Sequence, residues 1–301
     1  MQVAPDLLLG AVAGLLSSAF YAISVIIYKA LGQEIRPIAV SAIKMWVALA
    51  FISMLVLSPF RTTPFYVPLE SVIALGVSVT VGTVIGDTAY LVSQDRIGVS
   101  YAFPITCAYP IATYTLAFLF LGEQIVGSKV LGVALAVAGI VLISRGQNQS
   151  SAIGEKKRGS DVFGIAMALV ALILYSVSTV LIQVGMTGVD PVDGNLVRMV
   201  VGSIELAPAF AIARRFGMPF PSKHGIKVTI VAAFFGMALG SLLYVASIKY
   251  AGATIGSVLG STSPLFGVPI AYAYLKERVS KSELAGIVAA MVGVFLTVVS
   301  L

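Results

Sequence analysis

Four ionisable side chains lie inside long apolar runs of the sequence: Lys44, Asp87, Arg198 and Glu205. An ionisable residue near the middle of a membrane helix costs at least about 2.5 kcal/mol, so it persists where it faces a polar cavity or a partner. Lys44 and Asp87 lie at similar depths below the ends of their runs, which predicts that they pair. Glu205 is two helical turns from Arg198 and is interpreted as structural. The alternative for the two cations is that they extend to lipid headgroups or close structural ion pairs.

Hydroxyl-bearing side chains recur on one face of two apolar segments. Tyr21 and Ser24 share a face of the first segment, and Tyr175 and Ser178 hold the equivalent places in a later one. Such a stripe on a lipid-embedded helix suits a polar cavity that binds hydrogen-bonding solutes, although interhelical hydrogen bonds would use the same residues. With these four we group the remaining candidate solute-binding residues: Lys44, Tyr90, Thr106, Tyr109, Arg198, Tyr244, Ser261 and Ser263.

Proline interrupts two apolar segments next to polar side chains. Pro110 directly follows Tyr109, and Pro264 directly follows Ser263. Proline removes an amide donor and clashes with the carbonyl of the preceding turn, so the helix kinks and frees polar backbone groups. We expect Pro110 and Pro264 to act as gate hinges beside a binding site, the alternative being kinks without a ligand role.

The sequence carries no signature of a hydrolytic or metal-dependent enzyme. It contains no His-Glu-x-x-His, no Gly-x-Ser-x-Gly and no cluster with metal-ligand spacing. The lone histidine, His224, lies in a polar stretch, and a single cysteine, Cys107, excludes an internal disulfide. We therefore predict a protein that is not an enzyme, uses no cofactor and binds no metal.

The composition assigns these residues to membrane helices. The chain has 301 residues, of which 58% are hydrophobic and 11% charged, and its mean hydropathy is +1.01. A soluble domain carries about 25% charged residues, so a soluble fold is excluded. The net charge of +6 is spread over segment ends rather than over one face, which favours contact with membrane lipid and not with nucleic acid.

Ten segments approach the length of about 20 apolar residues that a bilayer core requires. We predict an all-α integral membrane protein with ten transmembrane helices. Their approximate limits are Leu7–Leu31, Ile38–Leu57, Ser71–Ser93, Val99–Leu121, Val130–Ile143, Val162–Val184, Val192–Ala213, Val228–Ile248, Ala253–Leu275 and Leu284–Leu301.

The second half of the chain repeats the first. A shift of 154 residues aligns the halves without a gap and pairs residues of distinctive type: Tyr21 with Tyr175, Gly86 with Gly240, Tyr90 with Tyr244, Gly98 with Gly252 and Pro110 with Pro264. We predict one five-helix repeat over residues 7–145, a polar linker over 146–161 and a second repeat over 162–301. Because five is odd, the second copy enters the membrane from the opposite side, which makes an inverted repeat of the kind that secondary transporters use.

The repeat separates the buried charges into matched and unmatched residues. Lys44 aligns with Arg198, whereas Asp87 aligns with Ser241. An acid without a counterpart in the other half is the better candidate for proton coupling, and we assign that role to Asp87.

The two halves end in similar motifs. The first carries Ile97-Gly98-Val99-Ser100-Tyr101-Ala102, Tyr109-Pro110 and Leu121-Gly122-Glu123, and the second carries Tyr250-Ala251-Gly252-Ala253, Ser263-Pro264 and Leu275-Lys276-Glu277. In these motifs the chain resembles the EamA family of the drug/metabolite transporter superfamily, and the resemblance covers nearly its whole length. It implies ten helices around a central cavity and the export or exchange of small organic metabolites by alternating access.

Basic residues are divided unevenly between the two ends of the predicted helices. Arg61, Lys129 and Lys249 fall at one end. The larger set falls at the other: Arg36, Arg96, Arg145, Lys156, Lys157, Arg158, Arg214, Arg215, Lys223, Lys227, Lys276, Arg278 and Lys281. The positive-inside rule places the larger set in the cytoplasm and both termini outside the cell.

Together these patterns favour a secondary transporter that moves a small organic metabolite, amino-acid-like or drug-like, across the cell membrane, with export as the favoured direction. Its partners would be the solute, membrane lipid and, for coupled transport, protons. The alternatives are an intramembrane lipid-handling protein, an enzyme without a recognisable catalytic motif, or a non-transporting scaffold, and none of them accounts for the inverted copies. The sequence leaves open the solute, the direction, the coupling ion and the choice between monomer and homodimer.

Overall fold

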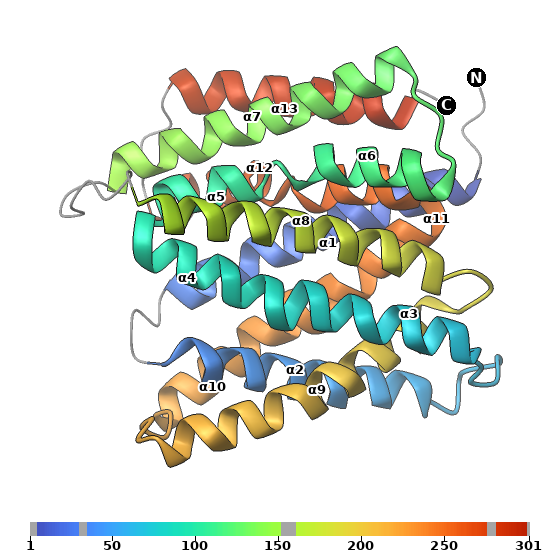
Figure 1. Ribbon diagram of the computed structural model, residues 1–301, viewed down its shortest axis with the longest axis vertical. Helices are drawn as coiled ribbons and strands as arrows, with labels where there is room; N and C mark the ends of the chain where they lie inside the picture. The colour runs from blue at the N-terminus through green and yellow to red at the C-terminus, as the bar shows by residue number, and fades with distance from the viewer. Residues whose placement is uncertain (1–4, 30–34, 152–160, 276–280, 300–301) are drawn as a thin grey trace.

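The computed structural model describes residues 5–29, 35–151, 161–275 and 281–299, and every regular element in these ranges is helical (Figure 1). The elements are α1 (Pro5–Lys29), α2 (Pro37–Val56), α3 (Leu69–Val79), η1 (Thr80–Gly86), α4 (Asp87–Ile97), α5 (Val99–Thr106), α6 (Tyr109–Leu121), α7 (Gly127–Ser151), α8 (Val162–Gly185), α9 (Pro191–Arg215), α10 (Lys223–Ala233), η2 (Phe234–Gly240), α11 (Ser241–Gly260), α12 (Ser263–Leu275) and α13 (Lys281–Val299). The predicted all-α class is confirmed.

The helices cross the molecule between two ends. One end carries Arg36, Arg96 and Arg215, where α2 begins and where α4 and α9 finish, and we call it the basic end. It lies on the left of Figure 1. The opposite end holds the turns from α2 to α3, from α6 to α7 and from α8 to α9, together with the start of α1 and the end of α13.

Eight helical segments within the described residues are long and apolar enough to cross a membrane, fewer than the ten predicted. The fifth predicted helix corresponds to Gly127–Ile143, which is apolar but shorter. The predicted eighth and ninth helices meet at Gly252, a non-helical residue inside the apolar stretch Lys223–Gly260. The helix α7 continues through Ser151, into the predicted linker.

Local sequence sets the helix ends. Pro191 stands in the first turn of α9, where its missing N–H costs nothing, and Asp190 caps that helix by accepting a hydrogen bond from the N–H of Val192 at 2.9 Å. Gly98 ends α4 with a φ of 79°, and its repeat mate Gly252 interrupts α11 with a φ of 87°. Glycine adopts this left-handed backbone without strain, so both halves turn at the same place.

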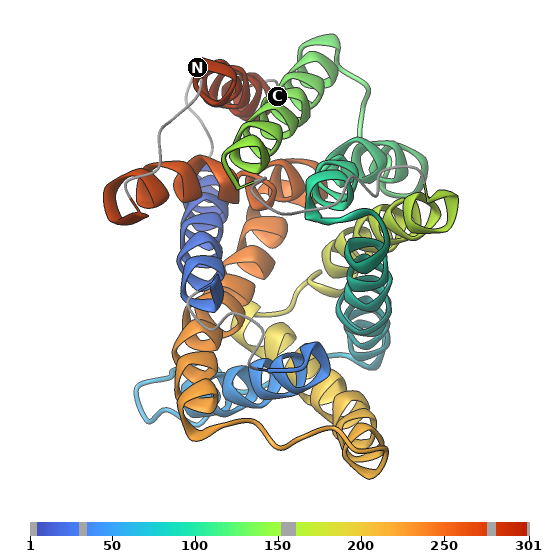
Figure 2. The ribbon, with the colours of Figure 1, turned by 90° about the vertical axis from the view of Figure 1, so that its left-hand side faces the viewer.

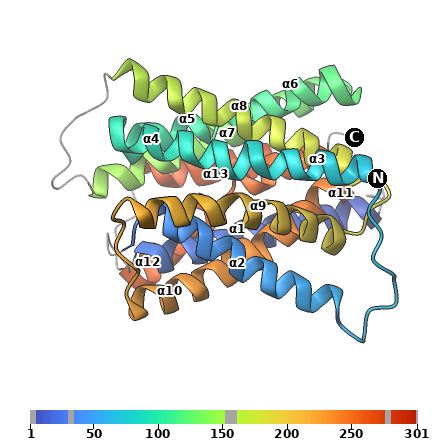
Figure 3. The ribbon, with the colours of Figure 1, turned by 60° about the horizontal axis from the view of Figure 1, so that its bottom comes forward.

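The two halves interlock, because the first helix of each half packs against helices of the other half. α1 lies along α11 and η2, and α8 lies along α3, η1 and α4, so each repeat-equivalent helix packs on the other half. Figure 1 shows α1 and α8 crossing the molecule in opposite senses. α2 lies beside α9 (Figure 3), around the buried side chains of Met45, Ile52 and Met199. α7 and α13 pack on each other at one edge of the molecule (Figure 2).

A π-helix interrupts an equivalent helix in each half. η1 and η2 are both seven residues long, and they are related by the repeat shift of 154 residues. Asp87 directly follows η1, and Ser241 directly follows η2. π-Helical turns are rare and occur often at functional sites, so this shared irregularity marks the segments that lead into the centre of the molecule.

Each π-helix also contains a glycine that packs closely against a serine of the opposing half. A Cβ added to Gly82 would lie 2.7 Å from the Cβ of Ser178, and one added to Gly236 would lie 2.7 Å from the Cβ of Ser24. Ser178 and Ser24 are repeat mates, as are the two glycines. Only a residue without a side chain permits this approach, because real Cβ atoms do not come so close.

Candidate functional site

A cavity of about 280 Å³ lies between the two halves. Asp87 lines it together with eleven of the twelve predicted solute-binding residues: Tyr21, Lys44, Tyr90, Thr106, Tyr109, Tyr175, Ser178, Arg198, Tyr244, Ser261 and Ser263. Ser24 is the exception. Its side chain is buried against Gly236 rather than turned to the cavity, because the close approach of α1 to η2 leaves it no room.

The carboxylate of Asp87 enters the cavity from the first turn of α4. The hydroxyl of Tyr175 donates a hydrogen bond to its Oδ1 atom at 2.9 Å. The predicted contact between Asp87 and Lys44 is not formed, since no nitrogen-to-oxygen approach of 4.0 Å or less joins them in the described part of the chain. Lys44 remains partly exposed in the wall of the same cavity.

Arg198 is a buried cation in the cavity wall, with 5% of its surface exposed. Its Nε donates a hydrogen bond to Oγ of Ser78 at 3.2 Å, and Ser78 in turn donates to the carbonyl of Leu75 at 2.6 Å. Within the described ranges Arg198 forms no ion pair. The protein therefore fixes this guanidinium in place without neutralising it.

A layer of hydroxyl groups lies in the cavity wall on the side away from the basic end. Tyr109 donates to the carbonyl of Ser257 at 2.9 Å, and its hydroxyl lies 3.4 Å from that of Tyr244. The Tyr244 hydroxyl lies 2.9 Å from Oγ1 of Thr179. Tyr244 also packs against a buried apolar cluster: Leu75, Ile182, Met186, Val189, Val245 and Ile248.

The two predicted hinge prolines stand where helices restart. Pro110 lies in the first turn of α6, after a break at Cys107 and Ala108, and Pro264 lies in the first turn of α12, after a break at Ser261 and Thr262. The predicted interruption of both segments is therefore present, and each break places polar residues against the cavity. Because the first turn of a helix needs no N–H partner for proline, neither residue distorts a helix interior.

A second cavity of about 590 Å³ leads from the central one toward the basic end. Residues of α2, η1, α4 and α9 line it, with the turn after α9. Thr83 and Asp87 line both cavities. Asp87 therefore stands between the centre of the molecule and its basic end.

An ion pair joins the two halves at the opposite end. Arg61, in the turn after α2, contacts Asp193 of α9 through Nη1 to Oδ1 and Nη2 to Oδ2, both at 2.6 Å. The backbone N–H of Tyr66 adds a 3.3 Å hydrogen bond to the same carboxylate. The side chains of Arg61 and Asp193 are 12% and 2% exposed. The hydrogen bond that Arg61 donates to Asp193 raises the pKa of Arg61 above its usual value.

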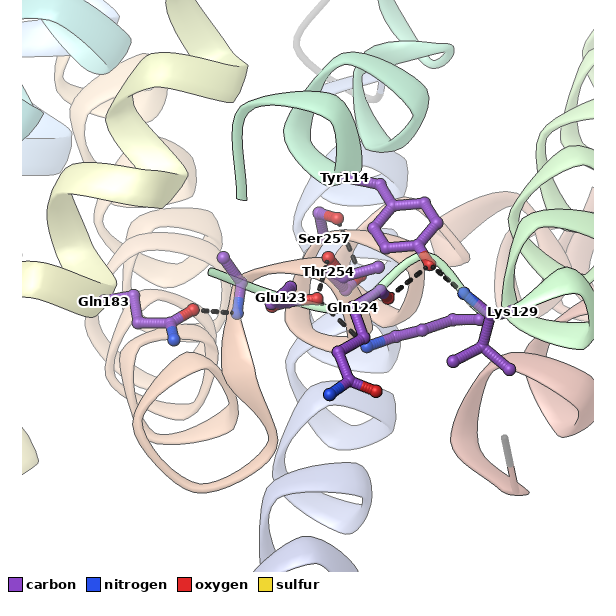
Figure 4. A network of polar contacts seen from close by, with 9 residues as sticks. Tyr114, Glu123, Gln124, Lys129, Gln183, Thr254 and Ser257 are labelled. Carbon is purple, nitrogen blue, oxygen red and sulfur yellow. Dashed lines mark hydrogen bonds and ion pairs between the residues drawn. The ribbon is translucent and has the colours of Figure 1, made fainter. Parts of the chain in front are cut away.

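A second polar network lies at the same end (Figure 4). Oε2 of Glu123 accepts hydrogen bonds from Nζ of Lys129 at 2.9 Å and from Oγ1 of Thr254 at 2.8 Å. Thr254 follows the bend at Gly252, so Glu123 of the first half is tied to the turn of the second. Gln183 of α8 accepts a hydrogen bond from the N–H of Ala253 at the same bend.

The contacts at this end were not predicted from the sequence. Asp193 follows Pro191 in the first turn of a helix, where an acid is commonly explained by the helix dipole alone. In the sequence Glu123 stands out only as part of the motif Leu121-Gly122-Glu123. One signal in the sequence could have indicated them. Arg61 and Lys129 are two of the few basic residues at an end that otherwise lacks positive charge, and a cation in such a place suggests an acidic partner nearby. Glu205, interpreted as structural, accepts a hydrogen bond from Thr80 at 2.6 Å.

Comparison with known proteins identifies the family of this chain. The model of the EamA-like transporter family matches residues 8–145 and again residues 162–299. The chain belongs to this family. As an EamA-like transporter with several membrane-spanning helices, it is a multi-pass membrane protein whose partners include a small solute and lipid.

The fold of this EamA-like transporter is shared with a solved crystal structure that aligns with 98% of both chains at a TM-score of 0.76 and 14% sequence identity. A shorter likeness links it to the probable aquaporin AqpM of Archaeoglobus fulgidus, which is 38% identical over 79 residues. That stretch is 26% of this chain, and the chain spans only 31% of the aquaporin. The match is too short to transfer an activity.

Proposed function

We propose that this EamA-like transporter is a secondary transporter that moves a small organic solute across the cell membrane by alternating access. The observation that carries the proposal is the unequal state of its two ends. The central cavity continues through a second cavity toward the basic end, whereas ion pairs and a tyrosine layer between the halves close the other. An alternating-access carrier needs this arrangement in one of its states.

Within the cavity the solute would meet side chains of both halves. Tyr21 and Tyr175 are repeat mates and offer hydroxyls from opposite helices, and Ser261 and Ser263 offer further hydroxyls from the break before α12. Rocking of the halves would exchange these contacts between the two ends. The helix breaks before Pro110 and Pro264 are the proposed hinges, because they lie beside the cavity in equivalent positions.

Asp87 is the proposed proton-coupling residue. It shares the cavity wall with Lys44 of α2, Tyr175 of α8 and Tyr21 of α1. The other titratable groups of the described lining are Tyr90, Cys107, Tyr109, Arg198 and Tyr244. It is the only carboxylate among the described residues of the central cavity lining. Its place between the two cavities would give it access to water from the basic end while Tyr175 binds it.

Orientation follows from charge. The basic end would face the cytoplasm and the termini the outside, as the positive-inside rule requires. The cavity would then be open to the cytoplasm, where an exporter binds its solute. The same orientation places the Arg61–Asp193 pair at the outer face.

Transport into proteoliposomes tests the proposal. Protein reconstituted with and without a proton gradient is expected to accumulate solutes from a mixed metabolite pool, and the gradient should increase accumulation. Asp87→Asn should remove the effect of the gradient, whereas Glu70→Gln, an exposed acid in the first turn of α3, should leave it unchanged. Gradient-driven accumulation by Asp87→Asn equal to that of the unchanged protein would exclude the proton role.

A further inference from the structure

We propose that the central cavity selects organic anions and that Arg198 binds their charged group directly. The inference rests on the proposed function, since it names the chemical class of the transported solute. It follows from the two cations of the cavity wall, which form no ion pair within the described residues. Arg61, Arg96 and Lys129 each contact a carboxylate within the protein. Arg198 and Lys44 have none among the described residues, and both line the cavity.

The charges of the lining do not cancel. Lys44 and Arg198 contribute two positive charges and Asp87 one negative charge, counting the described residues of the cavity wall. A buried charge without a counterion is unfavourable, and the surrounding helices and lipid offer little screening. An organic monoanion neutralises the excess, whereas a cationic solute would enlarge it. The bound state is therefore most favourable for an anion.

Arg198 has the geometry of a preorganised anion ligand. Its Nε is held by Ser78, and only 5% of the residue is exposed. Nη1 and Nη2 donate to no atom of the described residues. Both atoms keep some exposed surface, since neither belongs to the fully buried polar atoms that lack a partner. They therefore face the cavity. A guanidinium fixed in this way presents two parallel N–H donors, which match the paired oxygens of a carboxylate or phosphate.

Lys44 adds the second positive charge from the opposite half. It is the repeat mate of Arg198 and it is not bound to Asp87, whose carboxylate accepts from Tyr175 instead. The remainder of the wall is rich in rings: Tyr21, Tyr90, Phe103, Tyr109, Tyr175 and Tyr244. Rings pack against an apolar or aromatic body. The expected solute is thus an anion whose charged group is attached to an apolar or aromatic body.

Three probes of the same skeleton but different charge test this selectivity: hydrocinnamate, hydrocinnamamide and phenylpropylammonium. Thermal unfolding of the purified full chain in detergent measures binding, because a ligand of the folded state raises the unfolding temperature. Hydrocinnamate should stabilise the protein, and the amide and the ammonium should not. Loss of a charge-assisted hydrogen bond should raise the half-effective hydrocinnamate concentration about tenfold or more in Arg198→Gln.

Matched variants separate charge from folding. Arg198→Lys should keep part of the affinity, and Lys44→Gln should weaken it without touching the Ser78 contact. Arg96→Gln, which removes an exposed cation outside the cavity, should leave it unchanged. If Arg198→Gln does not yield folded protein, Lys44→Gln carries the comparison. Stabilisation by the ammonium, stabilisation by none of the three probes, or hydrocinnamate affinity unchanged in Lys44→Gln and Arg198→Gln would each overturn the inference.

Proteoliposome uptake distinguishes failure of the inference from failure of the proposed function. Arg198-dependent binding of hydrocinnamate without accumulation of any solute would support the anion site and refute transport. Uptake of neutral or cationic solutes that is unaffected by Arg198→Gln would support transport and refute the anion site.

Discussion

Arg61 and Asp193 join the two halves of the chain, 132 residues apart in sequence, through two contacts of 2.6 Å. The repeat shift maps this pair onto Arg215 and Ala39, and an alanine offers no carboxylate. The inverted repeat therefore has an ion-pair latch at one end and none at the equivalent place at the other. This difference favours the conformation that is closed at the Arg61 end.

Removal of the latch should open that end. Breaking one partner of a buried ion pair costs about 3–5 kcal/mol, and the closed conformation bears this cost in Arg61→Gln. With Ser241→Cys as a cavity reporter in a Cys107→Ser chain, labelling by an impermeant thiol reagent from the Arg61 end should accelerate about tenfold or more, since about 1.4 kcal/mol corresponds to a factor of ten.

The exposed pair of Arg96 and Asp161 is the matched control. These side chains are 54% and 32% exposed, and surface ion pairs contribute about 1 kcal/mol or less. Arg96→Gln should therefore leave labelling of the reporter cysteine unchanged. Equal labelling rates in Arg61→Gln and the unchanged chain would contradict the latch.

The Glu123 network should depend more on its charge than on its hydroxyl. Lys129→Met leaves a carboxylate that is 15% exposed with Thr254 as its remaining donor, and the expected loss of stability is about 3 kcal/mol. Thr254→Val removes one hydrogen bond and should cost about 1 kcal/mol. Thermal unfolding followed by circular dichroism measures both. Adding Glu123→Gln to Lys129→Met should recover part of the loss, and no recovery would argue against the ion pair.

The close approach of Gly82 to Ser178 should tolerate no methyl group. An added Cβ would lie 2.7 Å from that of Ser178, so Gly82→Ala should lower the free energy of unfolding by about 1–3 kcal/mol. Ser178→Gly should restore stability in the double variant. Gly127→Ala is the control, because nothing lies within 4 Å of its added Cβ. Equal thermal stability of Gly82→Ala and Gly127→Ala would show that η1 can move away at no cost.

Polar residues in apolar helices were good guides to the cavity. Tyr21, Tyr175, Lys44 and Arg198 lie in apolar segments, where a polar side chain outside the cavity would meet lipid, so facing a shared cavity is the favourable outcome. Ser24 shared the same pattern and faces a glycine instead. A helical face does not distinguish a cavity from a close helix contact, because both accept small polar side chains.

Other features depend on three-dimensional pairing. No sequence pattern distinguishes the π-helix η1 from α-helix. The structure shows it, together with a copy at the equivalent place in the other half, η2. Asp193 carried no distinctive spacing and gained its role from Arg61 in the other half. The predicted pair of Lys44 and Asp87 failed because equal depth in the membrane does not fix the distance across a cavity.

The hydroxyl layer that closes one end has an incomplete copy at the other. The repeat maps Tyr244 onto Tyr90 but Tyr109 onto Ser263, and both Tyr90 and Ser263 line the cavity. Ser263→Tyr would restore the missing ring and hydroxyl. It should favour closure at the basic end, so labelling of the Ser241→Cys reporter from that end should slow, and transport should slow with it.

Closure by this added tyrosine requires its hydroxyl as well as its bulk. Ser263→Phe supplies the ring alone and should slow labelling less than Ser263→Tyr does. Adding Tyr90→Phe to Ser263→Tyr removes the other hydroxyl and should restore faster labelling. If Ser263→Phe and Ser263→Tyr protect the reporter equally, the added ring is only plugging the cavity. The closed states at the two ends would then not be built on the same tyrosine pair.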